Sequence, residues 1–148
     1  MTHDSQRSDI EKKAQERTII QFAEANLRLR CESEQLQSIL ESTTALVYMV
    51  SRDGRFLFIN RVWERVFNMR NEKTVGRPLT DFFSKETADQ FMANNLNVIK
   101  ANKTLQFTET VPHHDGIRTY LTIKAPLLDT DGQPYGISGI STEITIKS

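Results

Sequence analysis

The residues of this sequence that could do chemistry are few and scattered. Cys31 is the single cysteine, so the chain can form no internal disulfide and no cysteine metal cluster. His113 and His114 are adjacent, and neighbouring side chains of an extended segment point in different directions, which makes a poor metal site. The acidic run Asp129–Gly132 lacks the glutamate that completes an EF-hand calcium loop. We therefore expect no metal site.

Composition excludes several further classes of protein. Catalysis would be indicated by a nucleophile beside a base, a zinc motif, a glycine-rich phosphate loop or a pair of carboxylates. None of these can be assembled from the sequence, so we expect no enzyme. The 19 basic and 19 acidic residues cancel, whereas nucleic-acid binding needs a basic surplus. The longest apolar run, Ala45–Val50, is far shorter than the ~20 residues of a membrane span. The lone cysteine and polar N-terminus favour a reducing, cytoplasmic location.

The elements that must position any site fall into two kinds of polypeptide. All 6 glycines and all 4 prolines lie after residue 53, and Phe22 is the only aromatic residue among the first 42. Nothing from Ser8 to Glu41 interrupts a helix, and strong helix formers dominate this segment. We expect a helix of about 50 Å, at about 1.5 Å per residue. The predicted division is residues 1–42 for this helix and 43–146 for a folded domain.

The apolar residues of the N-terminal helix follow a broken heptad repeat. One seam position holds Ile19, Asn26, Ser33 and Leu40, and the other holds Phe22, Leu29 and Leu36. An asparagine in such a seam fixes the register and the oligomeric state at some loss of stability. The pattern favours a parallel dimeric coiled coil, hence a homodimer, or a linker helix in a longer signalling rod. The alternative is a solvated helix packed on its own domain. Cys31 within the helix is interpreted as inert.

Three Asp-Gly pairs punctuate the remainder of the chain, and each lies between strand-like runs, which is a strong hairpin signal. The expected strands are Leu46–Ser51, Arg55–Ile59, Leu105–Val111, Ile117–Leu128 and Tyr135–Ile144. Between the second and third strands, Asn60 is expected to cap a helix to Phe67, and Ser84 a longer one to Ala101. The order predicts an α+β fold: a five-stranded antiparallel sheet with helices inserted on one face, preceded by the long helix.

Periodicity suggests which side chains face the core. In the longer helix the expected inward stripe is Ala88, Met92, Leu96 and Ile99, with Asn95 on its edge. In the fourth strand, Leu121 and Ile123 alternate with Tyr120 and Lys124, so the two pairs lie on opposite faces of the sheet. We expect Leu121 and Ile123 on the buried face and Tyr120 on the outer face, which the N-terminal helix is a candidate to cover.

Four segments, in order and at fitting spacing, resemble motifs of the PAS family of sensor domains. They are Asp53–Asn60, Val75–Arg77, His114–Gly116 with Tyr120 and Pro126, and Gly139–Thr145. The resemblance runs from about Leu36 to the C-terminus. It implies a sensor fold and an exit motif at Glu143, Ile144 and Thr145, where signalling to an output domain begins; Glu143 stands where that motif has aspartate.

The resemblance also allows cofactors to be tested residue by residue. A flavin–thiol adduct needs a cysteine in the helical region, and none follows Cys31. Haem ligation in the family commonly uses a histidine of the long helix, and Glu86–Ala101 contains none. A small apolar or mixed ligand, oriented by Asn95, is compatible with the residues between sheet and helices. These candidates are Trp63, Met92, Asn95, Leu96, Phe107, Leu121 and Ile123. The alternative is that they simply fill the core.

The favoured function is a dimeric sensory module of a bacterial signalling protein, such as a two-component system. A ligand or state change would pass through the flanking helices to a C-terminal output domain, which the resemblance implies is a histidine kinase or a diguanylate cyclase. One alternative is a ligand-free dimerisation scaffold. A second is a redox sensor that holds flavin without a thiol, with Trp63 stacked on the ring.

Overall fold

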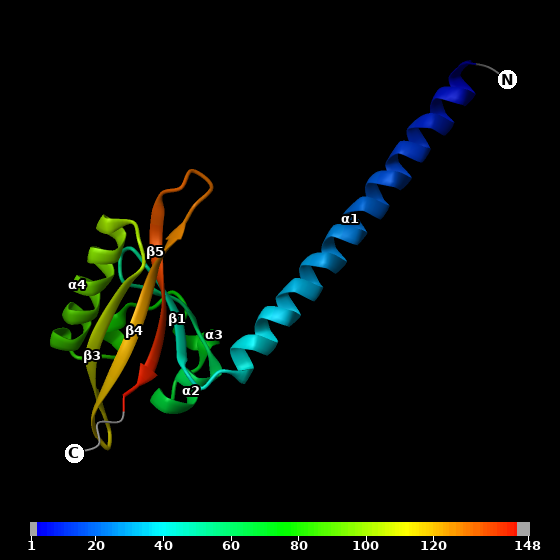
Figure 1. Ribbon diagram of the computed structural model, residues 1–148. Helices are drawn as coiled ribbons and strands as arrows, with labels where there is room; N and C mark the ends of the chain where they lie inside the picture. The colour runs from blue at the N-terminus through cyan, green and yellow to red at the C-terminus, as the bar shows by residue number, and fades with distance from the viewer. Residues whose placement is uncertain (1–2, 145–148) are drawn as a thin grey trace. The chain divides into compact units, whose positions relative to one another are not determined.

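A computed structural model describes residues 3–144, and the chain divides into two units between Ile39 and Leu40. The first unit consists of the part of α1 up to Ile39, and α1 (His3–Ser42) is an unbroken helix (Figure 1). None of its residues is buried. Helix-favouring residues and the absence of glycine and proline explain its length. The expected long N-terminal helix is therefore confirmed. The predicted domain boundary at residues 42 and 43 stays a prediction, and residues 145–146 lie outside the described part.

The second unit contains one five-stranded antiparallel sheet, as expected from the sequence. Its strands are β1 (Leu46–Ser51), β2 (Phe56–Ile59), β3 (Leu105–His113), β4 (Gly116–Leu128) and β5 (Pro134–Glu143). Their order is β2-β1-β5-β4-β3, so the first and last strands lie side by side within the sheet. In the register of the sheet, Tyr48 of β1 lies opposite Gly139 of β5, and Ile123 of β4 lies opposite Ile140 of β5.

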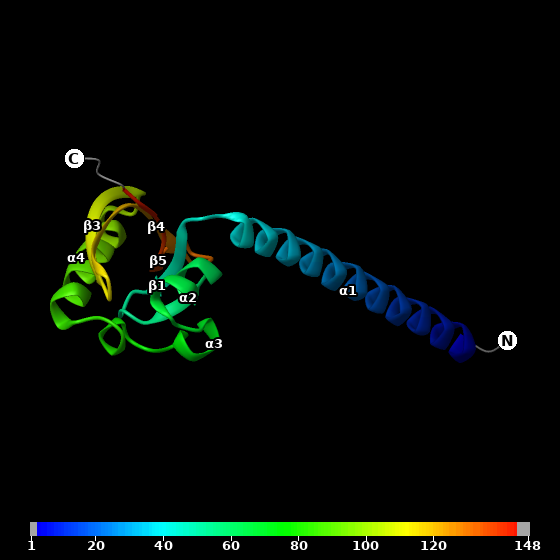
Figure 2. The ribbon, with the colours of Figure 1, turned by 90° about the horizontal axis from the view of Figure 1, so that it is seen from below.

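The helices lie between β2 and β3 in the chain and cover one face of the sheet (Figure 2). They are α2 (Arg61–Phe67), α3 (Asn71–Thr74), the 3₁₀ turn η1 (Leu79–Asp81) and α4 (Lys85–Ala101). The predicted caps are present: Asn60 Oδ1 accepts from the Trp63 N–H at 3.1 Å, and Ser84 Oγ accepts from the Thr87 N–H at 3.2 Å. The sequence gives no sign of α3, because four residues are too few for a helical period.

One expectation about which side chains face the core is wrong, and a second holds only in part. In β4 the buried residues are Tyr120, Thr122 and Lys124, whereas Ile123 is 45% exposed on the opposite face. Both sets of alternating residues in β4 mix polar with apolar side chains, so hydropathy alone selects the wrong one. In α4 Ala88 and Ile99 are buried and Met92 packs against the core, as expected, whereas Leu96 is 43% exposed. Leu96 follows the buried Asn95, and one residue turns a helix by about 100°.

Gly139 makes room for a core aromatic ring. A Cβ atom at this position would overlap the ring of Tyr48, its partner across β1 and β5. We predict that Gly139→Ala lowers the free energy of unfolding by about 1–3 kcal/mol, because the Tyr48 ring must leave its place. Urea unfolding measures the effect. Thr142→Ala, an exposed position of the same strand, is the control and should change stability by less than about 0.5 kcal/mol. An unchanged Gly139→Ala variant would contradict this packing.

Candidate functional site

The helices and the core face of the sheet enclose a cavity of about 20 Å³, which is room for about one water molecule. Its wall is mostly aromatic and aliphatic, from β1, β2, α2 and α4. The polar lining residues come from α4 and four strands: Asn95, Glu109, Lys124, Tyr48, Tyr120 and Ser141. The cavity is therefore apolar with a small group of convergent polar side chains, which is the usual character of a ligand site.

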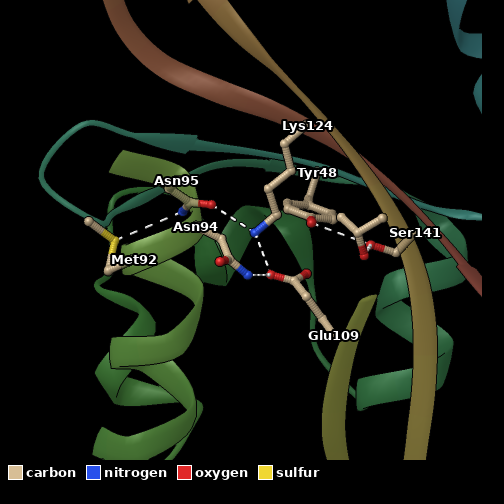
Figure 3. Close-up of polar contacts among 8 residues, drawn as sticks. Tyr48, Met92, Asn94, Asn95, Glu109, Lys124 and Ser141 are labelled. Carbon is tan, nitrogen blue, oxygen red and sulfur yellow. Dashed lines mark hydrogen bonds and ion pairs between the residues drawn. The ribbon is translucent and has the colours of Figure 1, made fainter. Parts of the chain in front are cut away.

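A buried ion pair is the most distinctive feature of the cavity. Lys124 Nζ lies 2.8 Å from Glu109 Oε2 and 2.8 Å from Asn95 Oδ1, and donates a hydrogen bond to each (Figure 3). Asn94 Nδ2 donates to the same Glu109 oxygen at 2.8 Å. The side chains of Lys124 and Glu109 are only 1% and 3% exposed. The pair thus joins α4 to β3 and β4 through bonds that water does not screen.

Burial of two charges opposes folding unless each charge is well paired. Loss of hydration lowers the pKa of Lys124 below its ordinary value, and the Glu109 carboxylate partly offsets this by favouring the ammonium. Three rings surround the ammonium, since Nζ lies 5.6 to 6.0 Å from the centroids of Phe91, Phe107 and Tyr48. Aromatic faces attract a cation, which further compensates for lost water.

A chain of hydroxyl groups borders the ion pair. The Tyr48 hydroxyl lies 3.3 Å from Ser141 Oγ, which in turn lies 2.9 Å from Thr122 Oγ1. Burial raises the pKa of Tyr48, and the charge of Glu109 adds to the rise, so the phenol stays protonated. This chain links β1, β5 and β4 beside the pair. The hydroxyl chain therefore joins the three central strands of the sheet.

Trp63 belongs to the aromatic core of the domain. Its ring lies 4.7 to 6.1 Å, centroid to centroid, from four other rings, those of Tyr48, Phe56, Phe67 and Phe83. Its Nε1–H points to Met69 Sδ at 3.3 Å. The rings around it occupy the surroundings that a stacked flavin would need, so the geometry favours a packing role for Trp63.

An open groove of about 470 Å³ lies beside the cavity, and Phe67 lines both. His113 stacks on Phe67, with 4.7 Å between ring centroids, and its Nε2 lies 3.0 Å from the Tyr120 hydroxyl. His113 lies in β3 and is half-buried, whereas His114 is exposed. Phe67, His113 and Tyr120 thus separate the groove from the cavity.

His113 should make stability depend on pH. Burial lowers its pKa below 6.5 and Arg118 and His114 add to this, while Asp115 and Glu143 oppose it. The unfolded chain then binds the proton more readily, so the free energy of unfolding falls as pH drops from about 6.5 through the folded pKa. Urea unfolding between pH 7.5 and 5.5 should show a steeper loss for the wild type than for His113→Phe, which keeps the ring. His114→Asn should follow the wild type. Equal slopes for wild type and His113→Phe would contradict the assignment.

The structure brings together only part of the ligand set expected from the sequence. Trp63 and Asn95 line the cavity. Met92 and Phe107 pack against the core beside it, and Asn95 Nδ2 lies 3.9 Å from Met92 Sδ. Leu96, Leu121 and Ile123 lie outside, the last two because they occupy the other face of β4.

Sequence reasoning missed the charged members of the site, Lys124 and Glu109, as well as Tyr48 and Ser141. One signal was available. Both charged residues interrupt strands at core-facing positions of the alternation, Lys124 with Tyr120 in β4 and Glu109 with Val111 in β3. Opposite charges at core-facing positions of neighbouring strands indicate a pair, because a buried charge is costly without a partner.

The other predicted sites are placed as follows. The helix residues Ile19, Phe22, Asn26, Leu29 and Leu36 are exposed along α1, and Leu40 is half-buried. At the expected exit motif, the Ile144 N–H donates to the Thr119 carbonyl at 2.8 Å. Glu143 Oε2 lies 4.0 Å from Arg118 Nη1. Thr145 lies outside the described residues.

Residues 3–144 contain neither a metal cluster nor a membrane-spanning helix. Over that range no three histidine, cysteine, aspartate or glutamate side chains gather as a metal site. No helix among the same residues combines the length and apolar character that crossing a bilayer requires. Cys31 is free and exposed.

A sequence profile described as the PAS fold matches residues 40–148. The chain belongs to the PAS family. This match confirms the resemblance inferred from the four motifs. The core site described above is thus the interior of a PAS domain, between its sheet and its helices.

Two curated relatives place this PAS domain among signalling proteins. It is 26% identical over 120 residues to the methanogenesis regulatory histidine kinase FilI of Methanothrix harundinacea, matching 81% of this chain and 14% of that protein. It is 24% identical over 110 residues to a diguanylate cyclase of Vibrio cholerae, matching 72% of this chain and 34% of that protein. The chain thus spans a minor part of each relative. The PAS domain is a sensory fold, and these matches indicate a sensory signalling module.

Solved structures share the fold. A structure described as VqmA bound to DPO superimposes with a TM-score of 0.66 at 18% identity, over 77% of this chain and 58% of that chain. The PAS domain of BvgS from Bordetella pertussis does so with a TM-score of 0.64 at 19% identity, over 78% and 88%. At such identity the likeness concerns the fold alone.

Proposed function

We propose that this PAS domain is a ligand-responsive sensory module and that a small molecule binds in its core cavity. The observation that carries the proposal is the Lys124–Glu109 ion pair, held by Asn95 inside an aromatic wall. A buried ion pair is weak support for stability, since a well-packed apolar pair of similar volume is often as stable or more so. Convergent polar groups in an apolar cavity are what a small ligand needs for orientation.

The contacts suggest how occupancy would reach the ends of the domain. The site joins α4, through Asn95, to strands β3 and β4, and the hydroxyl chain from Tyr48 to Ser141 continues into β1 and β5. Strand β5 ends at Glu143, next to the Ile144–Thr119 hydrogen bond. A ligand that moves Lys124 would shift the C-terminal end of β5. Glu143, Ile144 and Thr145 would then pass the change to an output domain. Both curated relatives, a kinase and a cyclase, are consistent with an output domain in cis.

A homodimer through α1 is the second part of the proposal. Large apolar side chains at both seam positions are more than half exposed: Ile19 at one, and Phe22, Leu29 and Leu36 at the other. A helix that exposes an apolar seam is stabilised when a second copy covers it. In this proposal the paired helix has two alternative arrangements, and the PAS domain shifts the equilibrium between them.

A ligand-free scaffold is the competing function, and one observation favours it: the cavity of about 20 Å³ holds no more than a water without side-chain movement. A scaffold needs only the helix and the sheet, so the ion pair would have no role. The two functions therefore differ in what the ion pair does.

A thermal-shift screen of the full chain against a metabolite library distinguishes them. We expect at least one member to raise the melting temperature of the wild type and to lose most of this effect in Lys124→Met/Glu109→Leu. The control is Lys103→Met, at an exposed position, which should respond as the wild type does. A library in which no member stabilises the wild type would favour the scaffold.

A further inference from the structure

The ion pair leaves hydrogen-bonding capacity unused. A lysine ammonium has three N–H donors, and Lys124 gives two of them to Asn95 and Glu109. Glu109 accepts both of its hydrogen bonds on Oε2, and within residues 3–144 no partner contacts Oε1. Every enclosed side-chain nitrogen and oxygen of the described residues has a partner, so Oε1 borders open space, and Glu109 lines the cavity. One donor and one acceptor are therefore available side by side.

Charge balance restricts which ligands can bind to the free donor of Lys124 and the free acceptor of Glu109. The pair is neutral as a unit and almost fully buried. An anionic ligand would leave an excess negative charge beside Glu109, and a cationic ligand would do the same for positive charge beside Lys124. Only an uncharged molecule leaves the cavity balanced.

The cavity wall restricts shape. Phe91 and Tyr48 lie around the ammonium, and Phe56 continues the aromatic lining. Flat rings stack well on such walls. Space is scarce, so the ligand must be small and side chains must yield. Phe67 lines both the cavity and the open groove, so a ligand that enters from the groove has to displace its ring.

Building on the proposed function, we infer that the cavity binds a small, uncharged, planar heterocycle whose hydrogen-bond acceptor and donor atoms are bonded to the same carbon. The acceptor takes the third N–H of Lys124, and the donor gives its hydrogen to Glu109 Oε1. The ring lies among the aromatic side chains. This inference names the ligand chemistry, which the family membership alone leaves open.

The test uses four probes of similar size and the full chain labelled with ¹⁵N. 2-Pyridone carries the acceptor and the donor on one shared carbon, N-methyl-2-pyridone lacks the donor, benzoate is charged, and benzene is apolar. Titrations followed by ¹H–¹⁵N correlation spectra report binding at cavity residues such as Asn95. We expect 2-pyridone to bind, N-methyl-2-pyridone to bind about tenfold more weakly or worse, and benzoate not to bind in the cavity.

The variant Lys124→Met/Glu109→Leu separates recognition from folding. It should lose at least about tenfold in affinity for 2-pyridone while binding benzene no more weakly than the wild type, because its cavity is apolar. Lys103→Met should match the wild type. Benzene or benzoate binding the wild-type cavity as tightly as 2-pyridone would overturn the ligand class and leave a ligand-binding sensor in place. No shift at cavity residues with any of the four probes would count against the ligand class and the sensor together.

Discussion

Replacing Lys124 with methionine is expected to lower the free energy of unfolding by about 3–5 kcal/mol. The change removes the ammonium that neutralises Glu109, a side chain only 3% exposed. The carboxylate is then buried with Asn94 as its one remaining donor among the described residues. A buried charge without its partner is among the largest single-residue penalties in a folded protein. Urea unfolding followed by circular dichroism measures the loss.

The double variant Lys124→Met/Glu109→Leu gives this prediction its control. With both charges removed, most of the lost stability should return, and the variant should come within about 1 kcal/mol of the wild type or exceed it. Lys103→Met, at an exposed site, should change stability by less than about 0.5 kcal/mol. If the single and double variants were equally unstable, the side chains would act by packing and the ion-pair account would fail.

Replacing Leu29 and Leu36 together with aspartate should convert the proposed dimer to monomers. The two side chains are 61% and 62% exposed in the single chain and occupy the same seam position. Pairing two copies would bury four carboxylates with no counter-charge, so the dissociation constant should rise at least about a hundredfold, or 2.8 kcal/mol. Sedimentation equilibrium of both proteins measures it.

The matched control places the same charges off the seam. Gln21→Asp/Gln35→Asp adds two carboxylates at exposed positions of α1 that the heptad directs away from the partner, and it should stay dimeric. The proposed coiled-coil dimer would be contradicted by a monomeric wild type. It would also be contradicted by a Leu29→Asp/Leu36→Asp variant that dimerises as the wild type does.

The order of elements was predictable because local signals were strong. Each Asp-Gly pair marks a turn, and Gly54 and Gly132 adopt positive φ angles of 85° and 77°, a region that glycine enters without strain. The caps Asn60 and Ser84 marked helix starts to the residue. Such signals act within a few residues, so no tertiary information was needed.

The faces of the elements were harder to predict, and the site depends on them. Strand β4 alternates apolar and polar residues on both faces, and the core side is the one that carries Lys124. Hydropathy ranks lysine as a surface residue, and only the nearby Glu109 and Asn95 reverse that preference. Their contact joins residues 15 and 29 positions apart in the chain. A window of local sequence does not contain this information.

Native mass spectrometry of the full chain, after incubation with a metabolite extract and removal of unbound molecules, tests the central claim most directly. The wild type should gain the mass of a small uncharged compound, and Lys124→Met/Glu109→Leu, folded but without the ion pair, should not. Contradiction would take one of two forms: neither protein gains mass, or both gain the same mass to the same extent.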